Sequence, residues 1–217
     1  MKRRRGFTWI ELLISAIITL TLFLYLGALF NKARRSFTQN YCPSSLKQIG
    51  VGFLQYAQDN DERFPPVSVS DVKPVGMNDT KSYKPFGWAD AANSYIRDTN
   101  VFQCPNEELT TAISDQTQSG YTDYWFNSNL SNVKLNVLAS PAQTILSGDG
   151  NDGTDMTNAR YSLNALPPAW LDTEGSPARR HLDTANYLFA DGHVKSFRPQ
   201  QITTLPTTQS SSTFSIR

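Results

Sequence analysis

The sequence predicts an α+β protein in which a long N-terminal helix packs on a small antiparallel β-sheet with loop-rich insertions. Three observations predict this fold class. An apolar run at residues 7–30 is long enough to cross a bilayer as a helix, for which about 20 residues suffice. Apolar residues then recur every three to four positions, which is the period of a helix with one buried face. Short apolar runs near the C-terminus flank turn residues, as the strands of a hairpin do.

Residues 1–30 combine a basic leader with a membrane segment. Cationic side chains precede Gly6, and Glu11 is the one charged residue from there to position 30. A carboxylate at the bilayer centre is unfavourable by about 3 kcal/mol on insertion scales, so Glu11 favours a cationic partner. Cleavage after Gly6 would create one, because the new amine of Phe7 lies one helical turn away, in the same or a neighbouring copy. Snorkelling of Glu11 to the headgroups is the alternative.

The segments Gly6-Phe7-Thr8 and Glu11-Leu12-Leu13 resemble the class III leader of type IV prepilins and type II secretion pseudopilins. The resemblance implies that a prepilin peptidase cleaves between Gly6 and Phe7 and that the new terminus is N-methylated. It also implies that Glu11, the fifth residue after the cut, registers subunits in a helical filament. Trp9 stands where the family more often has leucine or valine, and the exchange keeps the position apolar.

These features predict a single-pass protein of the inner, cytoplasmic membrane with its N-terminus in the cytoplasm. The basic residues at positions 2–5 favour this orientation, whereas Lys32, Arg34 and Arg35 oppose it. Because long domains translocate largely regardless of charge, we expect the globular part on the periplasmic, extracytoplasmic side. A secretory signal peptide is the alternative, but its apolar core of about 7–15 residues is shorter than this run.

The chain of 217 residues is therefore expected to have five parts: a leader at 1–6, a membrane helix at 7–30, its amphipathic continuation at 31–60, a globular domain at 61–200 and a flexible Thr/Ser-rich tail at 201–217. The buried stripe of the continuation is formed by Leu46, Ile49, Phe53 and Ala57. Pro43 predicts a kink or a restart of this helix.

Beyond position 60 the expected elements are short. A helix is expected within 83–97, and strands at 121–127, 143–147, 185–189 and 193–197. Asp191-Gly192 lies between the last two runs and predicts a type I′ hairpin, because both central residues of that turn need positive φ.

Cys42 and Cys104 are the two cysteines. An even count in an exported domain predicts a disulfide. It would close a loop of about 60 residues and contribute about 4 kcal/mol in the chain-entropy model. Two buried free thiols are the alternative. Two cysteines alone make no zinc site, because structural zinc takes four ligands.

Further motifs resemble the pseudopilin-like proteins of unknown function that are typical of planctomycetes and related bacteria. These motifs are Cys42–Gly50, Tyr56–Asp59, Arg63–Pro66, Val101–Pro105 and the H-X9-DG motif of His181, Asp191 and Gly192. His181 and Asp191 would suit a base and its orienting group, but no nucleophile or metal accompanies them. We favour the alternative in which Asp191-Gly192 makes a turn and His181 hydrogen-bonds to a strand end.

A calcium site is the one cofactor that the sequence suggests. Oxygen ligands alternate with glycines at Asp149, Asn151, Asp152 and Asp155, an arrangement that calcium accepts. Major secretion pseudopilins are similar in having a calcium site in a C-terminal loop, although the ligand spacing here differs. An EF-hand is not completed, because its last ligand position is Arg160. A solvated Asp-Gly turn is the alternative.

Composition argues against a nucleic-acid partner. The net charge is +1, and seven of the 20 basic residues precede position 36, which leaves the soluble part acidic. We expect a structural subunit of a type IV pilus or type II secretion pseudopilus, and not an enzyme. Its expected partners are prepilin peptidase, other pilin-like or pseudopilin subunits, the inner-membrane assembly platform and membrane lipid, and its final location includes a surface filament.

Two other functions stay open at this point. The first is an anchored extracytoplasmic protein that does not polymerise and binds carbohydrate or a secreted partner through exposed Tyr121, Tyr124 and Trp125. The second is a hydrolase with a pocket lined by His181, His193 and Asp191. Aromatic residues in such a spread are more often core residues than a binding platform.

Overall fold

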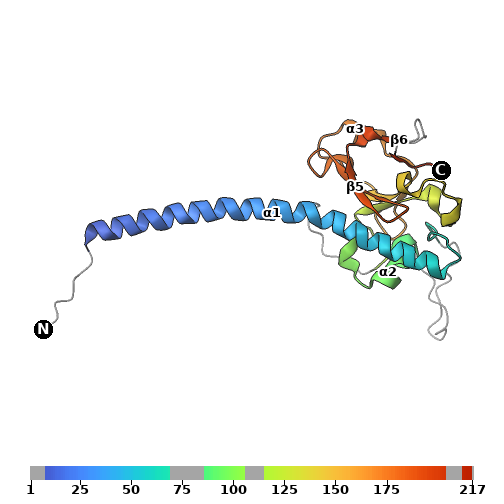
Figure 1. The fold of residues 1–217 in the computed structure, drawn as a ribbon, viewed down its shortest axis with the longest axis horizontal. Coiled ribbons are helices and arrows are strands. Elements are labelled where there is room, and N and C mark those ends of the chain that lie inside the picture. Colours follow the sequence, from blue (N-terminus) through green and yellow to red (C-terminus); the bar gives the residue numbers. More distant parts are fainter. Residues whose placement is uncertain (1–7, 69–85, 106–114, 204–211, 217) are drawn as a thin grey trace. The chain divides into compact units, whose positions relative to one another are not determined.

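A computed structural model describes residues 8–68, 86–105, 115–203 and 212–216, and of residues 28–39 the backbone only. In this part of the chain the α-helices are α1 (Trp9–Asp59), α2 (Trp88–Ile96) and α3 (Pro168–Asp172) (Figure 1). The strands are β1 (Tyr124–Asn127), β2 (Ile145–Asp149), β3 (Ser162–Leu163), β4 (Ala185–Phe189), β5 (Val194–Phe197), β6 (Ile202–Thr203) and β7 (Ser212–Thr213). Residues up to Gln39 and residues from Asn40 onward form two separate units.

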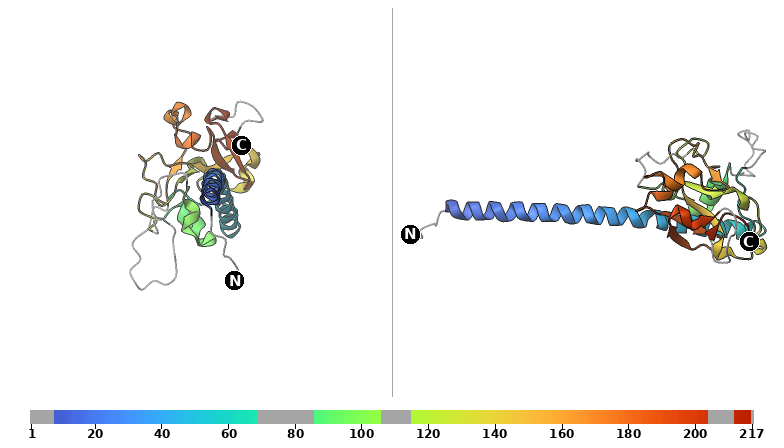
Figure 2. Two further views of the ribbon diagram at one scale, coloured as in Figure 1. Left: turned by 90° about the vertical axis from the view of Figure 1, so that its left-hand side faces the viewer. Right: turned by 90° about the horizontal axis from the view of Figure 1, so that it is seen from above.

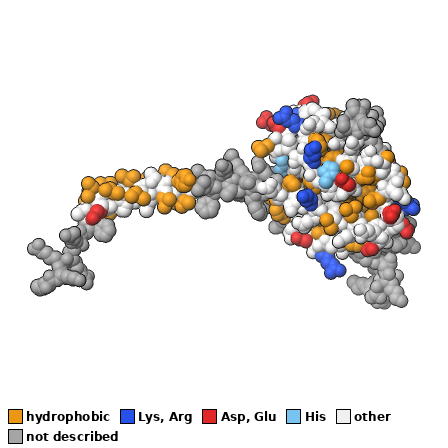
Figure 3. Space-filling view, viewed as in Figure 1, with side chains coloured by type: hydrophobic (Ala, Val, Ile, Leu, Met, Phe, Trp, Pro, Cys, Tyr) orange, Lys and Arg blue, Asp and Glu red, His pale blue; other side chains and the backbone are white. Residues whose placement is uncertain are grey.

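In the first unit, the helical segment Trp9–Gly27 is apolar on every side. Its large side chains are exposed, with Leu12 at 58% and Leu24 at 65%, and hydrophobic groups make up most of the face seen in Figure 3. By length and composition this segment of 19 residues can cross a membrane. The core helix of a soluble protein would be buried, whereas none of this window is.

In the second unit, the last turns of α1 form the predicted amphipathic helix. Leu46, Ile49, Phe53 and Ala57 are all buried, which confirms the predicted stripe. The helix continues through Pro43 without a break, so a restart at this residue is wrong.

Two glycines allow α1 to approach its neighbours on opposite faces. A Cβ atom at Gly50 would lie 2.8 Å from Leu188 of β4, and one at Gly52 would lie 2.9 Å from Ile96 of α2. Successive α-helical residues are about 100° apart, so positions two apart face nearly opposite directions. The last turns of α1 therefore lie between β4 and α2 (Figure 2).

The main sheet has the strand order β3-β1-β2-β4-β5. The pairs β1–β2, β2–β4 and β4–β5 are antiparallel, but β1 and β3 are parallel. The prediction of a wholly antiparallel sheet is thus wrong. The reason is the connection, since β3 follows β2 and returns to the far side of β1 without a hairpin, and long connections permit parallel pairing.

Both faces of the sheet are buried, and successive residues serve different cores. Tyr124 and Phe126 belong to the core beside α1 and α2, whereas Trp125 between them belongs to the core on the opposite face. In β4, Leu188 and Tyr187 divide in the same way. This follows from the period of two along a strand.

Residues 201–203 and 212–216 of the C-terminal segment are held by contacts with the fold. The predicted flexible tail is therefore wrong for these residues. Strands β6 and β7 pair in parallel. Phe214 is buried and stacks on Trp125 with ring centroids 4.9 Å apart, and its carbonyl accepts a hydrogen bond of 2.9 Å from Asn127. The buried Phe214 ring, the strand pairing and this hydrogen bond together hold a segment whose composition is otherwise that of a loop. Positions 204–211 of the predicted tail lie outside the described residues.

The β4–β5 hairpin has a three-residue loop. The backbone N–H of Gly192 donates to the carbonyl of Phe189, and the N–H of Phe189 donates to the carbonyl of His193, both at 2.9 Å. Gly192 has a φ of +89°, while Asp191 does not have a positive φ. The predicted type I′ turn is therefore wrong here, because only the glycine takes the left-handed conformation, as in three-residue hairpin loops.

Candidate functional site

A disulfide joins Cys42 of α1 to Cys104, which follows α2 in the chain. The two Cα atoms are 5.5 Å apart, and both cysteines are buried. The structure thus confirms the predicted disulfide. The bond fixes α1 to the segment after α2 within the core.

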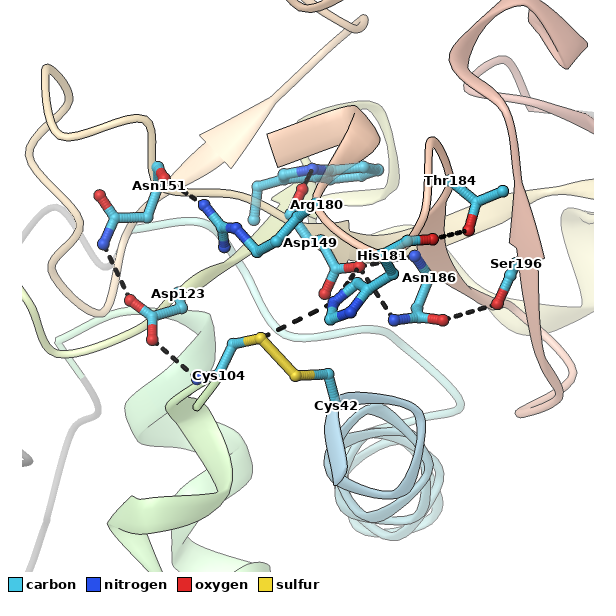
Figure 4. Close-up of polar contacts among 11 residues, drawn as sticks. Cys42, Cys104, Asp123, Asp149, Asn151, Arg180, His181, Thr184, Asn186 and Ser196 are labelled. Carbon is cyan, nitrogen blue, oxygen red and sulfur yellow. Dashed lines mark hydrogen bonds and ion pairs between the residues drawn. A yellow bond between two sulfur atoms is a disulfide. The ribbon is translucent and has the colours of Figure 1, made fainter. Parts of the chain in front are cut away.

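Beside this disulfide lies a buried pair of Asp149 and His181 (Figure 4). Asp149 is the last residue of β2, and its Oδ2 lies 3.3 Å from His181 Nε2. The same Oδ2 accepts hydrogen bonds from the backbone N–H and the side-chain amide of Asn186, at 2.6 and 3.1 Å. His181 Nε2 is also 3.7 Å from Cys104 Sγ. The imidazole therefore contacts both the carboxylate and the disulfide.

His181 is held in place by a two-residue turn. Its backbone N–H donates to the carbonyl of Thr184 at 2.8 Å, and the N–H of Thr184 donates back at 3.2 Å. Leu182 and Asp183 between them have φ values of 54° and 63°, as a type I′ turn requires. Each left-handed non-glycine residue costs about 1–2 kcal/mol. This strained turn leads into β4 and directs His181 towards Asp149.

A second buried carboxylate, Asp123, borders the pair. Its Oδ2 accepts a hydrogen bond of 2.7 Å from the N–H of Cys104, and its Oδ1 accepts one of 2.8 Å from the amide of Asn151. Burial raises the pKa of Asp123, and these two hydrogen bonds partly offset the effect. Arg180 donates to the carbonyl of Asn151 at 2.6 Å and is a cation of this cluster (Figure 4).

One oxygen of the cluster has no donor. Among the described residues, Asp149 Oδ1 is buried without a hydrogen-bond partner, and so is the hydroxyl of Tyr187. Burial and the nearby charge of Asp149 raise the pKa of Tyr187, so this phenol stays neutral. Because buried polar atoms are nearly always paired, an unpaired carboxylate oxygen calls for an explanation.

The H-X9-DG motif is divided between two sites. Asp191 Oδ1 lies 2.6 Å from Nδ1 of His193, and the His193 ring stacks on Phe189 at 4.3 Å. His181 instead contacts Asp149. This confirms the favoured interpretation, in which Asp191 and Gly192 form a turn and His181 bonds at a strand end. The other interpretation, in which His181 and Asp191 pair as a base and its orienting group, is wrong because each has a different partner.

The residues predicted to bind calcium have separate partners. Asp152 accepts from Thr154 and from the Trp170 indole at 2.9 Å, and Asp155 accepts from Tyr161 at 3.1 Å. Asn151 donates to Asp123, while Asp149 belongs to the histidine pair. In the described parts of the chain, the group of three or more His, Cys, Asp and Glu residues whose ligand atoms all lie within 4.8 Å of one another consists of Cys42, Cys104, Asp149 and His181. Calcium at Asp149–Asp155 stays a prediction.

The aromatic residues of the proposed binding surface are buried. Tyr121, Tyr124 and Trp125 are at most 2% exposed, so a binding platform formed by them is wrong. A surface hollow of about 600 Å³ is lined by Asn151, Asp152 and residues of the segment 169–180. This lining does not include His181, His193 or Asp191, which the hydrolase alternative requires.

At the start of α1, Glu11 forms a capping box with Thr8. The backbone N–H and the hydroxyl of Thr8 donate to Glu11 Oε2 at 2.8 and 2.9 Å, and the N–H of Glu11 donates to the Thr8 hydroxyl at 3.4 Å. This role was missed from the sequence, although Thr-x-x-Glu before an apolar run is its signature. The predicted cleavage residues Gly6 and Phe7 lie outside the described residues.

The architecture defines the class as an α+β protein with an apolar N-terminal helix, a small mixed sheet and one disulfide. The chain matches no family model, no curated protein and no solved structure. The function must consequently be inferred from this chain's own residues.

Proposed function

We propose that this protein is a membrane-anchored, prepilin-like structural subunit that assembles into a type IV pilus or a type II secretion pseudopilus. The observation that carries the proposal is the exposed apolar segment Trp9–Gly27 with Glu11 near its start. A helix that is apolar all round is stable in lipid or against other apolar helices. An acid near the end of such a helix is a functional residue by default, with a cation as its partner.

The leader before this helix supplies that cation. Cleavage between Gly6 and Phe7 by a prepilin peptidase would free an amine four positions before Glu11, and N-methylation would leave it cationic. The amine of one subunit then neutralises Glu11 of its neighbour as the helices pack. The globular domain stays on the extracytoplasmic side, where a disulfide such as Cys42–Cys104 persists.

The capping box provides a sharp test, because it separates the charge of Glu11 from its local hydrogen bonds. Glu11→Gln removes the charge and keeps an accepted capping-box residue, whereas Glu11→Ala removes both. Thr8→Ala is the matched control, since it removes the cap and leaves the charge. We expect all three variants to insert and to be processed, and only the two Glu11 variants to disappear from sheared filaments or purified pseudopilus complexes.

Normal assembly of Glu11→Gln would contradict the proposed ion pair between subunits. Loss of assembly in Thr8→Ala as well would instead assign the effect to the helix cap. Processing is checked by the intact mass of the native protein. The proposal requires the loss of residues 1–6, the gain of one methyl group and two missing hydrogens at Cys42 and Cys104. A native chain that begins at Met1 would overturn it.

A further inference from the structure

The buried cluster beside the disulfide has the composition of a metal site. Its four possible ligands come from α1, the segment after α2, the end of β2 and the turn before β4, and all are buried: Cys42, Cys104, Asp149 and His181. In the disulfide form the two sulfurs are bonded to each other. We infer that, when this disulfide is reduced, the same four side chains bind one Zn²⁺ ion.

The distances in the cluster fit a tetrahedral zinc ion. With Zn–S near 2.3 Å and Zn–N and Zn–O near 2.0 Å, the edges of the tetrahedron are about 3.6 Å for N···S and about 3.3 Å for N···O. His181 Nε2 lies 3.7 Å from Cys104 Sγ, which matches the N···S edge. It lies 3.3 Å from Oδ2 of Asp149, so the carboxylate whose other oxygen, Oδ1, would bind the ion is next to the imidazole. Two zinc-bound sulfurs are about 3.8 Å apart. Rotation about the Cα–Cβ bonds gives this spacing, because the Cα atoms of Cys42 and Cys104 are 5.5 Å apart.

The unpaired oxygen of Asp149 is an independent observation for a cation. Asp149 is 1% exposed, and among the described residues its Oδ1 has no hydrogen-bond donor. Asn186 donates twice to the other oxygen, Oδ2, and so holds the carboxylate in place. Carboxylates that bind a metal are usually oriented by hydrogen bonds of this kind. A zinc ion here would satisfy the oxygen that the disulfide form leaves without a partner.

Sulfur and nitrogen ligands with one carboxylate select zinc over calcium or magnesium, which take oxygen ligands. The two thiolates and the carboxylate carry three negative charges, so the site with Zn²⁺ has a net charge of −1. Arg180 lies in the same cluster and is the compensating cation (Figure 4).

A dithiol reductant gives two electrons and two protons to the Cys42–Cys104 bond, and itself becomes a disulfide. Zn²⁺ then displaces both thiol protons to solvent as two Zn–S bonds form. The newly made chain already has both thiols and needs no reductant. Zinc and the disulfide are thus alternative cross-links of the same two cysteines, one for the reduced chain and one for the oxidised chain.

The test uses the full chain in detergent, reduced anaerobically with a phosphine, and Co²⁺ as the spectroscopic probe. We expect one Co²⁺ per chain, with the visible bands of tetrahedral cobalt and a thiolate-to-cobalt charge-transfer band, both lost on adding Zn²⁺. The oxidised chain should show neither. His181→Gln and Asp149→Asn should each weaken Co²⁺ binding at least about tenfold, whereas the controls His193→Gln and Asp191→Asn should not change it.

Two results would overturn the inference. The first is a reduced, folded chain without tetrahedral cobalt bands, or with binding that depends on the thiols alone and is unchanged in both ligand variants. The second applies if the reduced chain unfolds, as judged by near-ultraviolet circular dichroism. The inference requires Zn²⁺ to restore this signal in the wild type but not in His181→Gln. A wild type that Zn²⁺ does not refold, or a His181→Gln variant that it refolds equally well, would refute the site. None of these measurements involves assembly, so the proposed function stands or falls separately.

Discussion

The molecule contains two Asp–His pairs of opposite character. Asp149 and His181 are buried next to the disulfide, and their closest atoms are 3.3 Å apart. Asp191 and His193 lie at the β4–β5 turn with side chains 37% and 41% exposed, and their closest atoms are 2.6 Å apart. We expect the shorter contact to contribute less to the free energy of unfolding, because water competes with the partners of an exposed pair. In the buried pair, by contrast, the loss of one partner leaves the other without compensation from water. Distance alone is thus a poor guide to the importance of a pair.

The comparison also shows how a sequence motif can join residues from different sites. H-X9-DG links His181 to Asp191 along the chain, yet each of them has a partner outside the motif. Nine residues separate the two, and they include the strained turn at Leu182-Asp183 and the whole of β4. His181 precedes β4 and Asp191-Gly192 follows it, so the strand separates the two halves of the motif. The spacing of nine residues therefore reflects the length of β4 and its preceding turn.

The largest effect should follow from changing the acid of each pair to asparagine. Asp149→Asn removes a carboxylate that accepts from Asn186 and contacts His181, so we expect a loss of about 2–3 kcal/mol in the free energy of unfolding. Asp191→Asn is the matched exposed change and should cost about 1 kcal/mol or less. Chemical unfolding of the full chain in mild detergent, followed by tryptophan fluorescence, measures both. Equal losses would contradict the ranking by burial.

A smaller effect is expected at the turn of the exposed pair. Gly192 has a φ of +89°, and a Cβ there would lie 3.2 Å from Leu54. Gly192→Ala should destabilise the fold by about 1–2 kcal/mol, because alanine is strained in the left-handed region. Gly175→Ala is the control with a φ of +76° and open space around the added Cβ. Thermal unfolding of both variants separates backbone strain from crowding. A Gly192→Ala variant as stable as the parent would refute the turn geometry.

The smallest effect has the opposite sign and concerns the turn of the buried pair. Leu182 is 79% exposed and has a φ of 54°. Leu182→Gly removes this strain and little packing, so we expect a gain of about 1 kcal/mol at most, reduced by the greater freedom of glycine in the unfolded chain. The midpoint of thermal unfolding should rise by a few degrees. A falling midpoint would show that the leucine side chain makes a stabilising contact.

Much of the fold was predictable because its signals are local. The stripe Leu46–Ala57 and the strands β2, β4 and β5 follow directly from periods of about 3.6 and 2, and the structure has them close to the expected positions. The disulfide followed from the count of cysteines. The parallel β1–β3 pairing and the ordered Phe214 were not predictable, since both depend on segments distant in sequence.

The candidate site was only partly predictable for the same reason. His181, Asp149 and both cysteines were each identified, but as members of three different proposals: a motif, a calcium loop and a disulfide. No local pattern shows that an aspartate at the end of β2 meets a histidine before β4. The capping box of Thr8 and Glu11 is the reverse case, because its signal is local and was present in the sequence.

The sequence by itself determined the apolar N-terminal helix, its single acidic residue, the amphipathic continuation and the available cysteines. These depend on composition and on periods within one element, which need no knowledge of neighbours. The tertiary structure alone decided that Cys42, Cys104, Asp149 and His181 meet in one buried cluster. Four elements must fold together before those side chains come within contact distance, and the low dielectric of the interior then determines their chemistry.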